Sequence, residues 1–248
     1  MVRQSNEDFS GALDCSSVGR GSLWLVADGM GGHNGGEVAS RLAVGAVLEH
    51  YPAVQGRRPD EWLERAFAWA NQTLVDQCVA NPGLQGMGTT LSALVLLDGH
   101  AVVVSVGDSR VYLLRKDGCT QLTEDDTVVA SMVRNGELTE IEAAVHPRRN
   151  ALTKAVGNDG YDGTSAVESI PLENGDIFLL CSDGLYAHVE PREFIPIVAS
   201  TNIETACANL LKLALARGGS DNITIMLVRA EMSARPSFAE PTLTLIPD

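Results

Sequence analysis

Five aspartates stand at the edges of apolar stretches that have the length of β-strands: Asp8, Asp28, Asp108, Asp183 and Asp221. One Asp beside Gly or Asn is most simply a turn residue. Five in this position suggest that the carboxylates meet, and carboxylates that meet repel one another unless some are protonated or cations lie between them. No cluster of His or Cys accompanies them, so an all-oxygen site for two hard cations, Mg²⁺ or Mn²⁺, is the simplest hypothesis. Two such ions about 3.5–4 Å apart activate a bridging water for attack on phosphorus.

The most informative of these positions is Asp28. The apolar run 23–27 predicts a buried strand that ends at Asp28, and a glycine-rich turn and a predicted helix follow it. The turn has neither the Lys-Ser/Thr of a P-loop nor the spacing of a Rossmann fingerprint, so it does not predict nucleotide binding. Asp28 and the Gly29 carbonyl instead offer hard oxygen ligands. A tight turn with a capping Asp remains an open alternative for this stretch alone.

The N-terminal segment 1–9 carries Arg3, Asn6, Glu7 and Asp8 close together. This density of charge is unusual for a first strand. We therefore interpret the segment as a second acidic contribution to the same site.

Composition restricts the class of protein. The 248 residues are 45% hydrophobic and 20% charged, as expected for one large globular domain or two small ones. The formal charge of −14 argues against binding to nucleic acid or to an anionic membrane. Five scattered cysteines without a Cys-x-x-Cys pair favour reduced thiols, and no apolar run approaches the roughly 20 residues of a membrane span. We expect a cytoplasmic protein.

Helical and strand periods alternate along the chain. Helices are predicted over 36–51 and from Pro59 to the stop signal at 81–83, and later over 192–200 and 203–217. Strands are predicted in two hairpins and in three later segments: 89–97 with 101–106, 110–115 with 119–122, and then 164–170, 176–181 and 223–228. Asp98-Gly99 is typical of the turn in the first hairpin. Hairpins imply an antiparallel sheet with helices packed outside it.

The segment 123–163 has few apolar runs and two short predicted helices, 125–135 and 139–145. We interpret it as a mobile surface insertion of the kind that gates a site. Beyond Arg229 the prolines and the lack of periodicity predict a loose tail, 231–248.

Eight short motifs occur in the order found in the metal-dependent protein phosphatases of the type 2C family, so the chain resembles a compact bacterial member over roughly residues 2–229. The motifs are Arg3-x-x-Asn6-Glu7-Asp8, Val26-Ala27-Asp28-Gly29-Met30-Gly31-Gly32, Gly88-Thr89-Thr90, Val106-Gly107-Asp108-Ser109-Arg110, Leu122-Thr123, His146-Pro147, Cys181-Ser182-Asp183-Gly184-Leu185 and Asp221-Asn222-Ile223-Thr224.

The resemblance implies an α+β fold: a four-layer sandwich of two central antiparallel sheets flanked by helices, formed by a catalytic domain over 1–230 with the insertion 123–163 as the family's flap. It implies removal of phosphate from phosphoserine and phosphothreonine in proteins, with two Mn²⁺ or Mg²⁺ ions and a possible third. The expected partners are phosphorylated proteins, among them a bacterial serine/threonine kinase and its substrates, and we expect a monomer.

The resemblance also implies a role for each matched residue. Asp28 would bridge both ions, the Gly29 carbonyl and Glu7 would serve the first, and Asp8 would support them. Asp183 and Asp221 would hold the second ion, so Asp28, Asp183 and Asp221 form the catalytic set. Asp108 with Asp183 would form a weaker third site, and Arg3 would bind the substrate phosphate. Ser182 and Cys181 are interpreted as structural, since no His stands beside them as a base.

Three positions depart from the family pattern. Met30 replaces a His proposed to protonate the leaving group in many eukaryotic relatives, and His33 is a possible substitute. Asp125-Asp126-Thr127 replaces a common Asp-His-Ser, and Ala187 replaces a common Asp. Two other functions stay open: a pseudophosphatase that binds phosphoproteins without turnover, and a metallohydrolase for small phosphate esters.

Overall fold

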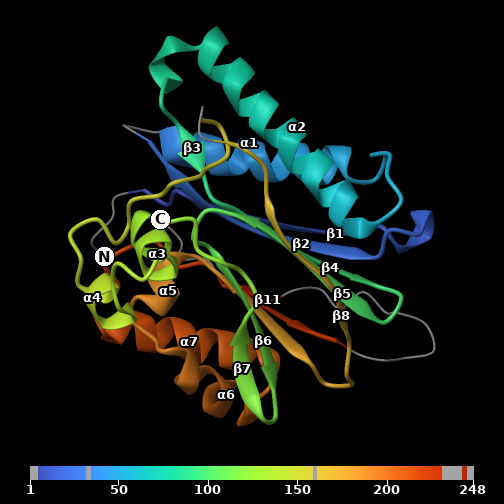
Figure 1. Cartoon of the computed structure of the whole chain (residues 1–248). Coiled ribbons are helices and arrows are strands. Elements are labelled where there is room, and N and C mark those ends of the chain that lie inside the picture. The colour runs from blue at the N-terminus through green and yellow to red at the C-terminus, as the bar shows by residue number, and fades with distance from the viewer. Residues whose placement is uncertain (1–4, 32–34, 159–160, 231–241, 245–248) are drawn as a thin grey trace.

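The protein is described by a computed structural model that covers residues 5–31, 35–158, 161–230 and 242–244. Within these residues two antiparallel sheets lie face to face (Figure 1). The first sheet has the order β1-β2-β4-β5-β8, with β3 paired to β2, and the second has the order β11-β10-β9-β6-β7. The strands of the first sheet are β1 (Asp8–Asp14), β2 (Ser22–Met30), β3 (Gly88–Thr89), β4 (Leu91–Leu97), β5 (His100–Val106) and β8 (Ser165–Pro171). Those of the second are β6 (Arg110–Arg115), β7 (Gly118–Gln121), β9 (Ile177–Cys181), β10 (Ile225–Arg229) and β11 (Thr242–Thr244).

Helices cover the outer face of each sheet. The helices α1 (Gly35–His50) and α2 (Pro59–Ala80) lie on the first sheet, and α6 (Pro191–Ala199) and α7 (Ile203–Ala216) lie on the second (Figure 1). A short 3-10 helix, Ser16–Val18, lies between β1 and β2, and another, Pro82–Leu84, lies between α2 and β3. The predicted four-layer sandwich is therefore confirmed.

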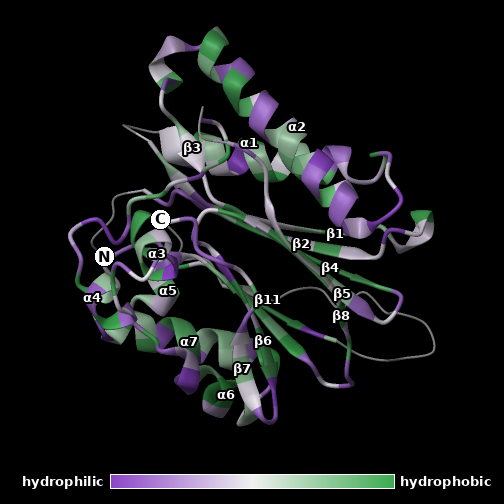
Figure 2. Ribbon diagram, viewed as in Figure 1, coloured by the Kyte–Doolittle hydropathy of each residue, from purple (hydrophilic) through white to green (hydrophobic). Residues whose placement is uncertain are grey.

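Alternation along the strands explains why four layers form. In β2, Leu23 and Leu25 pack in the core beneath α1 and α2, whereas Trp24 and Val26 pack between the two sheets. Strands β4 and β5 also contribute residues to both of these cores. In Figure 2, α2 alternates between hydrophobic and hydrophilic residues along its length. A sheet with two apolar faces needs a layer on each side, which the second sheet and the helices provide.

Most predicted elements are present, and the Asp98-Gly99 hairpin turn is confirmed by positive φ angles of 49° and 74°. The N-terminal segment differs from its prediction, because Asp8–Asp14 forms strand β1. The predicted strand 23–27 also continues through Asp28 to Met30 as β2, since β3 pairs with its last residues.

The insertion 123–163 contains α3 (Val128–Arg134) and α4 (Glu140–Ala144), both shorter than predicted. Thr127 and Thr139 cap these helices: their side-chain oxygens accept hydrogen bonds from the main-chain N–H groups of Ala130 and Glu142. Of the predicted tail 231–248, only residues 242–244 are described, and they form β11 against β10. Among the described residues, none of the helices combines the length and apolar character required to cross a bilayer.

Candidate metal centre

Strand pairing brings the first two predicted ligands together. Asp8 of β1 and Asp28 of β2 are direct partners in the antiparallel register, so their side chains lie on the same face of the sheet. Asp28 has the same strand parity as Trp24 and Val26, which pack between the sheets. Both carboxylates therefore project into the space between the sheets, at one edge of the sandwich.

The second sheet brings its acids to the same edge. Cys181 at the end of β9 is the register partner of Arg110 at the start of β6 and of Ile225 at the start of β10. Asp183 comes two residues after Cys181, and Asp108 comes two residues before Arg110, in the connection between the two sheets. Asp221 precedes β10. The end of β9 and the beginnings of β6 and β10 thus lie at one edge of the second sheet. The three acids next to these strand ends, Asp108, Asp183 and Asp221, are brought to that edge.

Close backbone packing holds Asp183 next to Asp221. Asp183 begins the short helix α5 (Asp183–Tyr186), and Gly184 follows it. A Cβ atom on Gly184 would lie 2.0 Å from the main-chain oxygen of Asn222, which no side chain permits. The glycine of the Ser-Asp-Gly motif is therefore needed for contact between the two loops that carry Asp183 and Asp221.

A buried serine joins the two sheets at this edge. The Ser182 hydroxyl donates to Oδ2 of Asp8 at 2.7 Å and accepts from the N–H of Thr224 at 3.0 Å. These bonds agree with the prediction that Ser182 is structural. Cys181 is also buried, and burial raises the pKa of its thiol far above the usual range, which leaves it without nucleophilic thiolate.

The Glu7 carboxylate and the Gly29 carbonyl both lie against the first turn of α1. A Cβ atom built on Gly36, in the first turn of α1, would lie 2.7 Å from Oε1 of Glu7 and 2.8 Å from the Gly29 carbonyl oxygen. The N–H of Gly29 also donates to the main-chain oxygen of Glu7 at 3.0 Å. A carboxylate oxygen and a carbonyl oxygen that lie against the same turn of α1 are donor types that Mg²⁺ and Mn²⁺ prefer, so these residues suit such an ion.

Asn222 holds Glu7 in this position. Its Oδ1 accepts from the N–H of Glu7 at 3.0 Å, and its Nδ2 donates to the main-chain oxygen of Ser5 at 3.0 Å. Sequence reasoning assigned Asn222 to a motif without giving it a role. Its position directly after Asp221 is the signal that could have found it, because a residue beside a metal ligand often orients another ligand.

Thr90 fixes the backbone of Asp28. The N–H of Asp28 donates to Oγ1 of Thr90 at 2.8 Å, and the N–H of Thr90 donates to the Asp28 carbonyl at 2.9 Å. The Thr90 hydroxyl is also 2.7 Å from that of Ser109, the residue after Asp108. Thr90 therefore connects two acids of the site.

The gathered carboxylates raise one another's pKa values. Burial raises the pKa of Asp28 well above its usual range, and the charges of Asp8, Asp183, Asp108 and Asp221 add to this effect. Burial raises the pKa of Asp8 to about 6, despite the opposing hydrogen bond from Ser182. Burial, with the charge of Asp183, raises the pKa of Asp108 to about 7. Carboxyls in this state gain from a cation among them.

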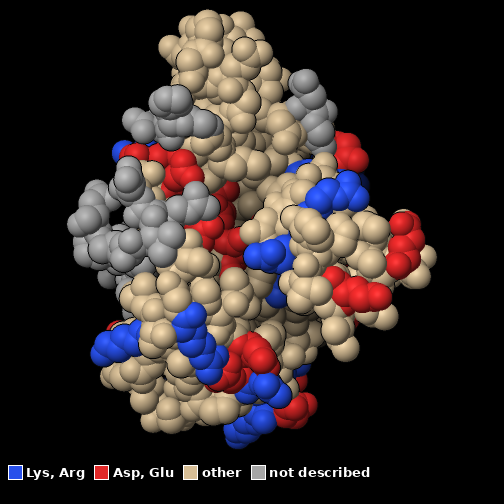
Figure 3. Space-filling model, turned by 90° about the vertical axis from the view of Figure 1, so that its left-hand side faces the viewer, with Lys and Arg blue, Asp and Glu red and all other residues tan. Residues whose placement is uncertain are grey.

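A hollow opens at one side of the molecule. Figure 3 faces the side on which α3, α4 and α5 lie, and acidic side chains line its central depression. Among the strand-edge acids, Oδ1 of Asp8 is buried with no hydrogen-bond partner among the described atoms. In the described part of the chain, no three His, Cys, Asp or Glu side chains stand in a ready-made ligand arrangement.

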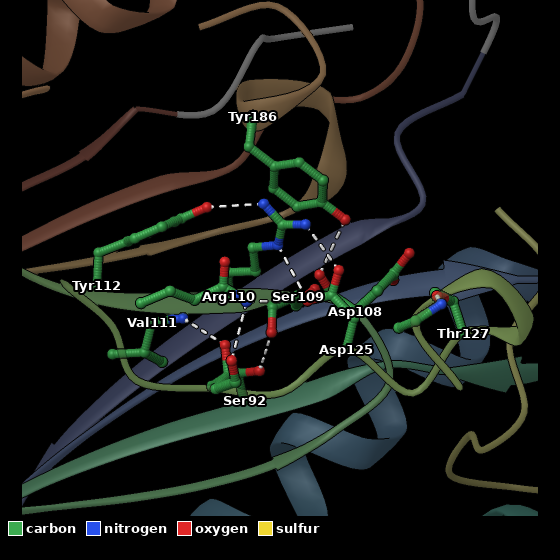
Figure 4. Close-up of polar contacts among 12 residues, drawn as sticks. Ser92, Asp108, Ser109, Arg110, Val111, Tyr112, Asp125, Thr127 and Tyr186 are labelled. Carbon is green, nitrogen blue, oxygen red and sulfur yellow. Dashed lines mark hydrogen bonds and ion pairs between the residues drawn. The ribbon is translucent and has the colours of Figure 1, made fainter. Parts of the chain in front are cut away.

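Asp108 is surrounded by a polar cluster that the sequence did not predict (Figure 4). Its main-chain oxygen accepts from the hydroxyl of Tyr186 at 3.0 Å, and the guanidinium of Arg110 lies 3.6 Å from the centre of the Tyr186 ring. Arg110 forms two hydrogen bonds to Asp125, of 3.0 and 2.7 Å. The first residues of the insertion are thereby attached to the loop of Asp108.

Asp126, the middle residue of Asp125-Asp126-Thr127, makes a second attachment. Its Oδ2 accepts from the N–H of Gly107 at 3.1 Å, and its own N–H donates to the Gly107 carbonyl at 3.0 Å. Ala187 is exposed and offers no ligand, which leaves Asp108 and Asp183 as the acids of the expected third site. Arg3 and His33 lie outside the described residues.

Comparison with known proteins agrees with this geometry. The sequence profile of the family Protein phosphatase 2C matches residues 3–215. The serine/threonine phosphatase stp of Listeria innocua is 36% identical over 236 residues, which are 93% of this chain and 92% of that protein. The crystal structure of the Mycobacterium tuberculosis serine/threonine phosphatase PstP/Ppp superimposes with a TM-score of 0.82 and 35% identity, and covers 93% of this chain and 94% of that one.

One similar structure contains metal ions. The catalytic domain of PstP in complex with two manganese ions has a TM-score of 0.78 and 34% identity, with 92% of this chain and 93% of that chain covered. The sequence match, the fold and the two manganese ions in this similar structure all indicate the same family. The chain belongs to the protein phosphatase 2C family, whose members are metal-dependent serine/threonine protein phosphatases that use a binuclear Mn²⁺ or Mg²⁺ centre.

Proposed function

We propose that this chain hydrolyses phosphoserine and phosphothreonine in proteins at the edge of the sandwich where Asp28, Asp183 and Asp221 gather. The observation that carries the proposal is that acids from both sheets gather around Asp28: Asp8 is its strand partner, and the charges of Asp183, Asp108 and Asp221 add to burial in raising its pKa. An array of this kind, open to a hollow of the surface, suits two hard cations and a phosphoryl group.

Each residue has a definite part in the proposed site. Asp28 lies among acids from both sheets, so it would be shared by the two ions. Glu7 and the Gly29 carbonyl would hold the first ion, with Asp8 in support, and Asp183 and Asp221 would hold the second. The ions, when bound, supply an activated water and stabilise charge on the phosphoryl oxygens.

The other side chains of the site hold and orient. Ser182 keeps Asp8 in place, Asn222 keeps Glu7 in place, and Thr90 fixes the main chain of Asp28. Arg3 is proposed to bind the substrate phosphate, because a guanidinium matches two phosphate oxygens. Met30 cannot donate a proton, so a water or another residue protonates the leaving serine or threonine oxygen.

Several wider assignments belong to the same proposal. Residues 1–230 form the catalytic domain, with 123–163 as the flap and 231–248 as a tail. Asp108 and Asp183 form a weaker third ion site. The substrates are phosphoproteins that include a bacterial serine/threonine kinase and its targets, and the chain acts as a monomer in the cytoplasm. The five scattered cysteines, which include no Cys-x-x-Cys pair, agree with a reducing compartment.

The test is phosphate release from a phosphothreonine peptide and from p-nitrophenyl phosphate, with Mn²⁺ and with EDTA. We expect hydrolysis of both with Mn²⁺ only, and loss of both in Asp183→Asn. Asp117→Asn is the control, because Asp117 is an exposed acid in the turn at the far end of β6. Binding of the peptide without turnover, or hydrolysis of the small ester alone, would contradict the proposal.

A further inference from the structure

Arg110 has more partners than its place at the start of a strand requires. Its side chain is only 21% exposed, and that of its ion-pair partner Asp125 only 14%. One guanidinium donates twice to Asp125, donates to the Tyr112 hydroxyl at 2.9 Å and stacks on the ring of Tyr186 (Figure 4). The two hydrogen bonds to Asp125 fix the edge of the planar guanidinium, and the Tyr186 ring fixes its face. Together these contacts leave the group a single orientation.

Tyr186 extends this contact to both acids of the third site. It lies on α5, one turn after Asp183, and its hydroxyl donates to the main-chain oxygen of Asp108 at 3.0 Å. Asp108 itself stands two residues before Arg110. The Arg110–Tyr186 pair therefore links Asp108, through a short chain of contacts, to the helix α5 that carries Asp183.

Asp125 and Asp126 attach the backbone on both sides of Asp108 to the insertion 123–163. Asp125 pairs with Arg110, and Asp126 exchanges two hydrogen bonds with Gly107. The residues on each side of Asp108 are thus attached to neighbouring elements. The direction of its carboxylate depends on these attachments, because the loop 107–109 itself is a connection between sheets.

We propose that Arg110 and Tyr186 are positioning residues that set the relative placement of the Asp108 and Asp183 carboxylates and so tune the affinity for the most weakly bound divalent cation. This inference rests on the third site of the proposed function. Neither residue touches substrate, and both act through the loop of Asp108 and the helix α5. Second-layer contacts of this kind commonly change metal affinity by one to two orders of magnitude.

The experiment measures bound Mn²⁺ directly, by titrating the metal-free protein and following unbound Mn²⁺ by electron paramagnetic resonance. Tyr186→Phe removes one hydroxyl and keeps the ring on which Arg110 stacks. We expect it to weaken the weakest Mn²⁺ site about tenfold and to leave the two tight ions in place. Arg110→Met should do the same. The double variant should be little worse than either single one, because both substitutions break one chain of contacts.

The chain offers close controls for both variants. Tyr51→Phe also removes a buried hydroxyl that donates to a main-chain carbonyl, that of Arg20, at the far end of α1. Arg115→Met removes an arginine of the same strand β6 that binds Asp176 through two hydrogen bonds of 2.8 Å. Both should lower the melting temperature without changing any Mn²⁺ affinity.

Asp108→Ala separates failure of this inference from failure of the third site. If Asp108→Ala abolishes the weak site and Tyr186→Phe leaves it unchanged, Arg110 and Tyr186 are structural and the inference is wrong. If Asp108→Ala also leaves Mn²⁺ binding unchanged, the third-site assignment fails and the inference falls with it. Equal weakening by Tyr51→Phe would also overturn it.

Discussion

At the scale of single residues, two glycines shape the site as much as its acids do. A Cβ atom on Gly29 or Gly36 would lie only 2.0 to 2.8 Å from neighbouring main-chain and carboxylate atoms. Neither glycine has a positive φ angle, so close approach alone explains them. The first turn of α1 can therefore reach β2 and leave the Glu7 carboxylate beside the Gly29 carbonyl.

Gly36→Ala tests this close approach. Its methyl group would lie 2.7 Å from the Glu7 carboxylate, so Glu7 must move away from the Gly29 carbonyl. We expect Mn²⁺ affinity at the first ion to fall at least about tenfold, with phosphopeptide turnover falling in parallel. Calorimetric titration with Mn²⁺ and a phosphate-release assay measure the two effects.

Gly45→Ala is the matched control for this substitution. Gly45 lies in the same helix, and no atom lies within 4 Å of its Cβ position. The change should stabilise the protein by about 1 kcal/mol through helix propensity and leave Mn²⁺ binding as it was. Unaltered Mn²⁺ affinity in Gly36→Ala would show that the Glu7 carboxylate does not serve an ion.

Residue types predicted the acids of the site but not their supports. Asp8, Asp28 and Asp183 could be found because acids at strand edges are conspicuous in a sequence. Sequence reasoning gave Tyr186 and Asn222 no role, since each acts through hydrogen bonds to residues far away in the chain. The burial of Asp108 likewise depends on Tyr186 and the insertion packing around it, which no local pattern shows.

At the scale of elements, β1 shows what local reasoning misses. Its residues are mostly half-buried, so its own alternation is weak, and Glu7 and Asp8 disguise its start. It forms because β2 is strongly apolar and offers a free edge, and Asp8 is its partner for Asp28. A strand whose formation depends on its neighbour leaves little signal in its own residues.

Asn222 makes a testable connection between elements. It joins the segment before β1 to the loop before β10, and so holds Glu7 from the other sheet. We expect Asn222→Ala to weaken Mn²⁺ binding about tenfold. Because Asn222 does not contact the reacting atoms, saturating Mn²⁺ should restore most of the turnover. The measurement is phosphopeptide hydrolysis as a function of Mn²⁺ concentration.

Asn81→Ala serves as the comparison, since Asn81 ends α2 and its amide bonds only to Gln77 of that helix. Its Mn²⁺ dependence should match that of the unmodified protein. If Asn222→Ala loses turnover that Mn²⁺ cannot restore, Asn222 has a direct part in the reaction and the assignment as a support is wrong.

At the scale of the whole molecule, the site exists because two sheets end at one edge. Local periodicity predicted the hairpins and the helices outside them, but it could not assign the strands to two sheets. That assignment depends on long-range pairing such as β5 with β8 and β6 with β9. The family resemblance supplied it, because eight motifs in order carry information about the fold that periodicity lacks.

The concentration of carboxylates also predicts how the whole fold responds to pH without metal. The pKa values of Asp8 and Asp108 are raised from 3.8 to about 6 and about 7, and that of Asp28 is also raised. Between about pH 4 and pH 7 the folded chain therefore binds more protons than the unfolded chain. Its free energy of unfolding consequently falls as the pH rises through this range.

We therefore expect the protein in EDTA to melt at a lower temperature at about pH 8 than at about pH 5.5. One pKa unit corresponds to about 1.4 kcal/mol and 1 kcal/mol to about 2–4 °C in a domain of this size, so the fall should be at least about 5 °C. Saturating Mn²⁺ should raise the melting temperature much more at the higher pH, where the carboxylates are ionised. Asp108→Asn should reduce the fall, because it removes one of the titrating groups, whereas Asp117→Asn should not. A melting temperature in EDTA that stays level or rises between these pH values would show that the carboxylates are not crowded at this edge.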